Sequence, residues 1–303
     1  MTADSRAVLI AVNKTAGDGR RAPAVSHLCA ELKRLALLPE IVDSLEELSV
    51  RTAELQQGGQ LRSIVAAGGD GTVAEIANRT VPETPIAVFP LGTENLLASY
   101  LRIKADPQAM ASIIAQGRTA LFDAGQANGR LFLLMASVGF DAEVVRKVHA
   151  VRNGHVSRWS YLKPILETIR TYEYPELRVA GIGSDSARFG PIHSRFAFVF
   201  NLPRYAAGLK FAPMADGTDG MLDLCTFRHG GLLSGLKYLA AVVRGRHRES
   251  ADFVGWSGPR LQIEADRPVP YELDGDPGGL LPLTINVVPR RMRFVVSSAW
   301  RPE

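Results

Sequence analysis

The strongest signal in this sequence is the stretch Ser63-Ile-Val-Ala-Ala-Gly-Gly-Asp-Gly-Thr72. An apolar run that is typical of a buried strand enters a glycine-rich turn, and helical spacing begins at Val73. Glycines let the backbone approach a phosphate chain closely, and the N–H groups at the start of a helix attract anions. We therefore expect this turn to bind phosphates, through Gly68, Gly69, Gly71 and Thr72.

Asp70 is the unusual member of this turn, because a carboxylate repels phosphates unless a cation lies between them. Mg²⁺, bound directly or through water, is the natural cation for such a position. The alternative is a tight strand-to-helix turn in which Asp70 only caps a helix. The coincidence of the strand, the glycines, the acid and the helix favours the phosphate site.

Two further polar loops follow predicted strands: residues 13–20 after the run at 7–12, and residues 90–95 after the run at 86–89. Each loop alone is a weak signal, and Thr93 can also cap the helix expected from Glu94. Strand–helix alternation over the first 120 residues predicts a parallel sheet with helices on its faces, and such sheets bind ligands at the carboxyl ends of their strands. The expected binding residues of these loops are Asn13, Thr15, Gly17, Gly92, Thr93 and Asn95, with Asp43 after a short strand at residues 40–42.

The composition of the sequence and the frequency of strand-like runs change near Phe122, which marks a domain boundary. Beyond it, strand-like runs are frequent and Gly, Pro and Asp cluster between them, which predicts a mostly β domain of sandwich type. Two helices are expected within it, at residues 157–172 and 232–244. The expected strands are residues 131–137, 176–180, 195–200, 221–227, 260–264, 284–288 and 293–296.

Two acidic turns lie in this second part. Asp216 and Asp219 can hold a hard cation through both carboxylates and a carbonyl such as that of Met221, although a plain Asp/Gly turn is about equally consistent. The segment with Asp274 and Asp276 around one glycine fits a hairpin turn. A carboxylate there can also take a proton from an attacking hydroxyl group.

The composition excludes several classes of protein. The chain has 303 residues, 35 Lys and Arg against 31 Asp and Glu, and a net charge of +4, which is not the profile of a dedicated nucleic-acid-binding protein. No window has the roughly 18 apolar residues of a membrane-spanning helix, and no signal peptide is recognised. Two cysteines form neither a disulfide framework nor a metal motif. We therefore expect a cytoplasmic protein.

Basic side chains gather at residues 146–158 and 244–248, either as solvated faces or as sites for an anionic membrane or phosphate groups. The second group ends an apolar helix face formed by Leu232, Leu233, Leu236, Leu239 and Ala240. A basic amphipathic helix can lie in a membrane interface. We favour the alternative of a core-packing helix, whose cationic end suits the helix dipole.

These motifs, in this order, resemble the diacylglycerol kinase catalytic-domain family, whose bacterial members are soluble lipid kinases related to sphingosine and ceramide kinases. The loop at residues 13–19 is similar to the family's NPxSGxG, residues 68–72 match GGDGT, residues 90–95 match PxGTxN, and residues 274–276 resemble DGE. Asp276 replaces the usual Glu, Lys14 and Ala16 replace Pro and Ser, and Leu96 stands where the family usually has an acid.

The resemblance implies an N-terminal α/β nucleotide-binding domain and a C-terminal β-sandwich-like domain, with the active site in the cleft between them. The last strand returns to the first domain, so the domains are residues 1–122 with about 291–303, and residues 123–290. By the same resemblance, Asp274 is the general base, Asp70 orients catalytic Mg²⁺, Asp276 joins the nucleotide-binding set, and a structural Mg²⁺ is held by Asp216, Asp219 and the Met221 carbonyl.

The implied activity is ATP- and Mg²⁺-dependent phosphorylation of a hydroxyl group on a diacylglycerol-like or sphingoid lipid, reached at the inner membrane surface. Two alternatives stay open: a kinase of a soluble substrate that resembles NAD kinases, and a lipid-binding regulatory protein that has lost catalysis, which Leu96 permits. The expected partners are the nucleotide and the lipid, not nucleic acid. Both a monomer and a homodimer remain open.

Overall fold

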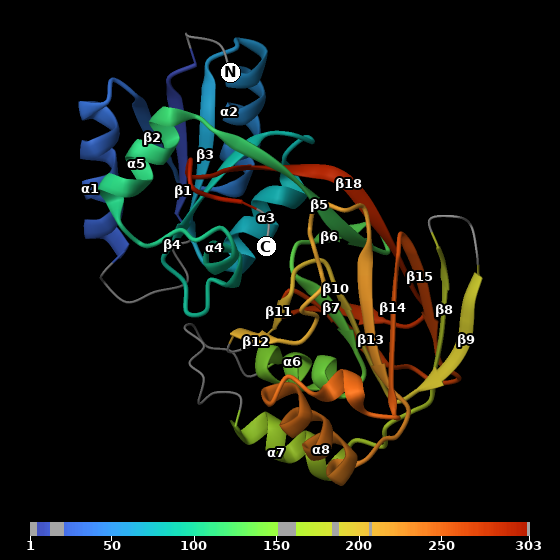
Figure 1. The fold of residues 1–303 in the computed structure, drawn as a ribbon. Coiled ribbons are helices and arrows are strands. Elements are labelled where there is room, and N and C mark those ends of the chain that lie inside the picture. Colours follow the sequence, from blue (N-terminus) through green and yellow to red (C-terminus); the bar gives the residue numbers. More distant parts are fainter. Residues whose placement is uncertain (1–4, 13–20, 151–161, 184–187, 206–207, 302–303) are drawn as a thin grey trace. The chain divides into compact units, whose positions relative to one another are not determined.

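The computed structural model describes residues 5–12, 21–150, 162–183, 188–205 and 208–301. The chain divides into two compact units (Figure 1). The first unit combines Met1–Phe122 with Arg290–Glu303, and the second is Asp123–Pro289. Each unit is described by itself below.

The first unit is built on a parallel sheet with the strand order β2-β1-β3-β4, followed by the last part of β18. The central strands are almost wholly buried apolar runs, as expected where helices cover both faces of a parallel sheet. The C-terminal segment does return to this unit, because Arg293 pairs with Pro85 of β4 in the parallel sense. The strands are β1 (Ala7–Val12), β2 (Leu38–Val42), β3 (Leu61–Gly68), β4 (Pro85–Pro90) and β18 (Leu283–Val295).

The helices of the first unit carry clear local signals at their ends. At the start of α2 the Ser44 hydroxyl accepts the Glu47 N–H, and the Glu47 carboxylate accepts the Asp43 N–H. This is a capping box displaced by one residue, because the N–H comes from Asp43 and not from the cap Ser44. Helix α5 begins after the cap Asp106 and ends at Gly117, whose φ of +67° suits a glycine. The helices are α1 (Arg21–Arg34), α2 (Leu45–Gln57), α3 (Asp70–Arg79), α4 (Leu96–Tyr100) and α5 (Pro107–Gln116).

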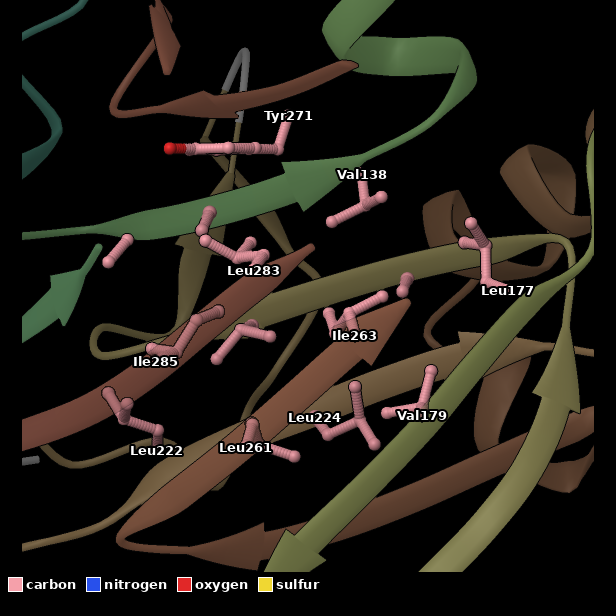
Figure 2. Close-up of a cluster of buried hydrophobic side chains, with 14 of the residues drawn as sticks. Val138, Leu177, Val179, Leu222, Leu224, Leu261, Ile263, Tyr271, Leu283 and Ile285 are labelled. Atoms are coloured by element: carbon pink, nitrogen blue, oxygen red, sulfur yellow. The ribbon is translucent and has the colours of Figure 1, made fainter. Parts of the chain in front are cut away.

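The second unit is a β-sandwich. One antiparallel sheet has the order β14-β13-β10-β7-β16-β17, and the first part of β18 continues into β15, β8 and β9. Apolar side chains from both sets of strands point toward one another and form the core (Figure 2). Its strands are β7 (Met135–Val138), β8 (Leu177–Ile182), β9 (Arg188–Ser194), β10 (Phe196–Phe200), β13 (Leu222–Phe227), β14 (Phe253–Gly258), β15 (Arg260–Glu264), β16 (Pro270–Leu273) and β17 (Asp276–Leu280).

Shorter strands and several helices complete this unit. Strand β5 (Thr119–Ala127) begins before the unit boundary and pairs with β6 (Arg130–Phe132). Strands β11 (Arg204–Tyr205) and β12 (Leu209–Lys210) form a small ribbon. The helices are α6 (Phe140–Ala150), α7 (Leu162–Thr171), α8 (Leu232–Val243) and a 3₁₀ turn at His247–Glu249.

Several elements differ from the sequence-based expectation. The strands expected at residues 284–288 and 293–296 are two ends of the single strand β18, which pairs with β15 at one end and β4 at the other. Helix α7 covers only the second part of the expected helix, whose first residues, 157–161, lie outside the described part of the chain. Helices α5 and α6 were not predicted.

Candidate functional site

The glycine turn after β3 lies directly against the loop that follows β4. A Cβ at Gly92 would collide with the Gly69 backbone, so the two loops can approach each other this closely only without a side chain there. A Cβ at Gly68 would likewise collide with the side chain of Thr72. The Leu91 N–H donates to the Gly68 carbonyl at 2.9 Å and links the loops further. The sequence motifs at 68–72 and 90–95 thus form one structural feature of the first unit.

Gly71 differs from these glycines, because in the described part of the chain no atom lies within 4 Å of where its Cβ would be. It lies in the first turn of α3, where the conformational freedom of glycine does not favour a helix. Packing therefore does not explain the residue. A bare backbone at a helix N-terminus is the feature that anions bind.

Asp70 reaches from the glycine turn to the start of the next helix. Its two carboxylate oxygens accept the N–H groups of Leu96 at 2.8 Å and Leu97 at 3.1 Å, at the first turn of α4. Burial raises the pKa of Asp70, the two backbone N–H groups oppose this, and the nearby Glu94 adds to it. The residue therefore does cap a helix, but α4 rather than its own.

The loop at residues 90–95 is held by Asn95. Its side-chain oxygen accepts the Gly92 N–H at 3.0 Å, and its amide donates to the Gly92 carbonyl at 2.8 Å. Thr93 was expected as a possible cap of the helix, but α4 begins only at Leu96 and Asp70 takes its N–H groups. The Thr93 side chain is exposed at the surface of the loop.

Of the other predicted binding residues of the first unit, the structure describes Asp43. Asn13, Thr15 and Gly17 lie outside the described residues. Asp43 follows β2, and its N–H is part of the capping box of α2.

Asp274, the predicted general base, lies in the turn between β16 and β17 with φ at +52°. Its carboxylate accepts three consecutive backbone N–H groups at the start of β7: Leu133 at 2.6 Å on Oδ2, and Leu134 at 2.8 Å and Met135 at 3.0 Å on Oδ1. The side chain is half-buried. These bonds fix the position of the carboxylate within the second unit.

Next to Asp274 lies a group of buried polar side chains that the sequence did not indicate as functional. Glu272 is 1% exposed, and its carboxylate accepts the Gly275 N–H at 2.6 Å. This hydrogen bond stabilises the turn that contains Asp274. Ser137 faces Glu272 across the β7–β16 ladder and donates to Asp141 at 2.7 Å. Tyr205 donates to the other oxygen of Asp141. The signal in the sequence that could have indicated this group is the acidic Glu272 within the otherwise apolar strand β16.

Burial is the main cause that raises the pKa of Glu272 well above its ordinary value, and the charge of Asp141 adds to it. Two neighbouring carboxylates with little access to water cannot both be ionised without cost, and burial raises the pKa of Asp141 as well.

This pair predicts a pH dependence of stability. A raised pKa in the folded state means that the contribution of Glu272 is complete below about pH 4.5 and is lost as the pH rises toward the folded-state pKa. Glu272→Gln keeps an acceptor for Gly275 and carries no charge, so its melting temperature should rise relative to the wild type as pH increases from 4.5 to 8. Glu264→Gln, on a 57% exposed side chain, is the control. Parallel melting curves for wild type and Glu272→Gln across this range would contradict the prediction.

The predicted metal loop has the oxygen-rich chemistry that Mg²⁺ prefers. The Asp216 carboxylate accepts the Thr218 N–H at 3.1 Å, and the Asp219 carboxylate accepts the Met221 N–H at 2.9 Å. Partial burial raises the pKa of Asp219, the Met221 N–H opposes this, and the charges of Asp216 and Asp123 add to the rise. A cation would relieve this repulsion.

Asp123 is a residue of this loop's surroundings that the sequence analysis did not select. It is 2% exposed and accepts the Gly220 N–H at 2.7 Å. In the described residues, however, no three His, Cys, Asp or Glu side chains are arranged as a metal site. The predicted ligand set has only two carboxylates, those of Asp216 and Asp219, with the Met221 carbonyl as the third ligand, so it stays a prediction.

Asp276 occupies the other side of the Asp274 turn. It lies 3.6 Å from Arg130 and 3.5 Å from His149, which both reach it within the second unit. The carboxylate is about one third exposed.

Comparison with known proteins gives matches over nearly the whole chain. Residues 7–127 match the diacylglycerol kinase catalytic domain, and residues 135–296 match the YegS C-terminal NAD kinase beta sandwich-like domain. A diacylglycerol kinase from Bacillus subtilis (strain 168) is 28% identical over 225 residues, which cover 72% of each chain. A diacylglycerol kinase from Mycobacterium tuberculosis (strain H37Rv) is 25% identical over 293 residues, 93% of each chain.

Solved structures share the fold. A diacylglycerol kinase from Bacillus anthracis str. Sterne superposes with a TM-score of 0.69 at 17% identity and 99% coverage of both chains. An NAD kinase from Archaeoglobus fulgidus in complex with ATP superposes with a TM-score of 0.56 at 17% identity, over 97% of this chain and 94% of that one. The predicted fold class, an α/β domain followed by a β-sandwich-like domain, is confirmed. The chain belongs to the diacylglycerol kinase catalytic-domain family of lipid kinases.

Proposed function

We propose that the protein transfers the terminal phosphate of ATP to a hydroxyl group of a diacylglycerol-like or sphingoid lipid, with Mg²⁺. The observation that carries the proposal is the pair of interlocked loops in the first unit, where Gly92 lies against Gly69 and Asp70 joins the turn to α4. This arrangement presents bare backbone and a helix N-terminus at the end of a parallel strand, which suits phosphate binding.

In the proposed reaction, the backbone of residues 68–72 binds the phosphates, and Thr93 and Asn95 lie in the adjoining loop. Asp70 would hold Mg²⁺, which when bound would neutralise the charge of the phosphates. The lipid oxygen forms a bond to the terminal phosphorus while the bond from that phosphorus to the bridging oxygen of ADP breaks. Asp274 accepts the proton of the hydroxyl group. A second, structural Mg²⁺ would be held by Asp216, Asp219 and the Met221 carbonyl.

The direct test is transfer of label from [γ-³²P]ATP into a total lipid extract in the presence of Mg²⁺. We expect a labelled lipid that is lost when EDTA replaces Mg²⁺, and its chromatographic mobility identifies the class of lipid. A parallel reaction with NAD as the acceptor tests the alternative of a soluble substrate. Label in NAD and none in lipid would overturn the lipid assignment, and label in neither would favour a binding role.

A further inference from the structure

Helix α8 exposes its most apolar face. Leu233 is 82% exposed, Leu236 is 52% exposed and Val243 is 63% exposed. Because an α-helix has 3.6 residues per turn, these side chains lie with Leu232 and Leu239 in one stripe along the helix. The expectation of a core-packing helix for this face was therefore wrong.

Helix α8 is part of the second unit (Figure 1), and the face opposite the stripe attaches it there. The Tyr238 ring stacks on Phe227 with 4.2 Å between the ring centroids, and its hydroxyl donates to Asp252 at 3.2 Å. Val242 is buried on the same side. The apolar stripe is thus not needed to hold the helix in place, and a contiguous exposed apolar patch marks an interaction surface.

The charge around α8 indicates what covers the stripe. Between Arg228 and Asp252 the chain has five cationic and two anionic side chains. Lys237 lies beside the stripe and is 67% exposed while it pairs with Asp252 at 3.1 Å, and Arg244 is exposed at the end of the helix. The two anions pair with two of the cations, Asp252 with Lys237 and Glu249 with Arg246, so cations exceed anions by three. An apolar stripe bordered by such an excess of cations matches the interface of an anionic bilayer.

The length of α8 excludes a spanning role. Its 12 residues extend about 18 Å, while the hydrocarbon core of a bilayer is roughly 30 Å thick. Nor is any other helix among the described residues both long and apolar enough to cross a membrane. The helix would therefore lie along the bilayer surface, with its axis in the plane of the headgroups.

We propose that α8 docks the protein on an anionic lipid bilayer, with Leu233 and Leu236 inserted among the acyl chains and Arg244 among the headgroups. The reason for such docking rests on the proposed function, since a lipid kinase must reach a hydroxyl group at the bilayer surface. The structural evidence does not depend on that function: it is the exposed apolar stripe of α8 and the basic side chains around it.

The test is co-sedimentation of the full chain with two kinds of vesicle, one of phosphatidylcholine alone and one that also contains about 40 mol% of the anionic lipid phosphatidylglycerol. We expect binding that increases with the anionic lipid and weakens with added salt. The double variant Leu233→Asp/Leu236→Asp should reduce the partition coefficient by at least about tenfold. Val50→Asp is the matched control, because Val50 is a 59% exposed apolar residue on helix α2, and it should bind like the wild type.

Two readouts separate this proposal from the proposed function. The double variant should phosphorylate lipid dispersed in detergent micelles at the wild-type rate, because no bilayer has to be bound there. Wild-type vesicle binding in the double variant, or wild-type binding that ignores the anionic lipid, would overturn the docking proposal while leaving the kinase activity intact. A concentration-dependent dimer that the double variant abolishes would also overturn it and assign the stripe to a second copy of the chain.

Discussion

Asp274→Asn will lower the turnover of lipid phosphorylation by about 10²- to 10⁴-fold, the range typical of a positioned general base. Asn tolerates the left-handed backbone of this residue, whose φ is +52°, and keeps one oxygen that can accept backbone N–H groups. It cannot accept a proton from the substrate. Initial rates at saturating ATP and lipid measure the loss of turnover, and calorimetric titration should show that ATP binding is retained.

The structure requires a control for this variant, because Asp274 accepts three backbone N–H groups and its amide would leave one of them without an acceptor. Asn128→Gly provides it. Asn128 lies in the same unit at a φ of +45°, accepts the Thr284 N–H at 3.0 Å and donates to the Pro282 carbonyl at 3.1 Å. This variant should lose a similar degree of stability and keep its turnover within about twofold. If Asp274→Asn retained wild-type turnover, the assignment of the general base would be wrong.

The parts of the fold that could be predicted are those with strong local signals. The runs at residues 7–12 and 63–67 are continuous apolar segments, and each became a buried parallel strand. Helix α5 shows that a local signal can also be overlooked, since Asp106-Pro107 at its start and Gly117 at its end are both recognisable. Strand β18 shows a real limit: its pattern breaks near Pro289, yet the strand continues because its two ends have different partners.

In the candidate site, too, local signals could be predicted from the sequence and contacts between distant residues could not. The glycine motifs were readable because the close approach of the Gly68, Gly69 and Gly92 backbone to its neighbours excludes a side chain at these positions. The link from Asp70 to the N–H of Leu96 spans 26 residues, and the electrostatic coupling of Glu272 to Asp141 joins a strand to the helix α6. Such contacts depend on how the elements pack, so neither the helix that Asp70 caps nor the raised pKa of Glu272 could be derived from spacing.

Asp70→Ala will lower turnover at least as much as Asp274→Asn, because Asp70 is expected to position the cation beside the phosphates. The residue also caps α4, and loss of a helix cap costs roughly 0.5–2 kcal/mol. The measurements are turnover as a function of Mg²⁺ concentration and the melting temperature of the same preparation.

Asp106→Ala separates the two roles of Asp70. Asp106 caps α5 in the same unit, where its carboxylate accepts the Ala109 N–H at 3.0 Å, and it lies in no motif of the candidate site. Asp70→Ala removes the acceptor of two backbone N–H groups and Asp106→Ala removes the acceptor of one, so both variants should lose stability in the range of a helix cap. Loss of turnover confined to Asp70→Ala would then reflect its effect on the cation and the phosphates, whereas equal turnover in both variants would reduce Asp70 to a helix cap.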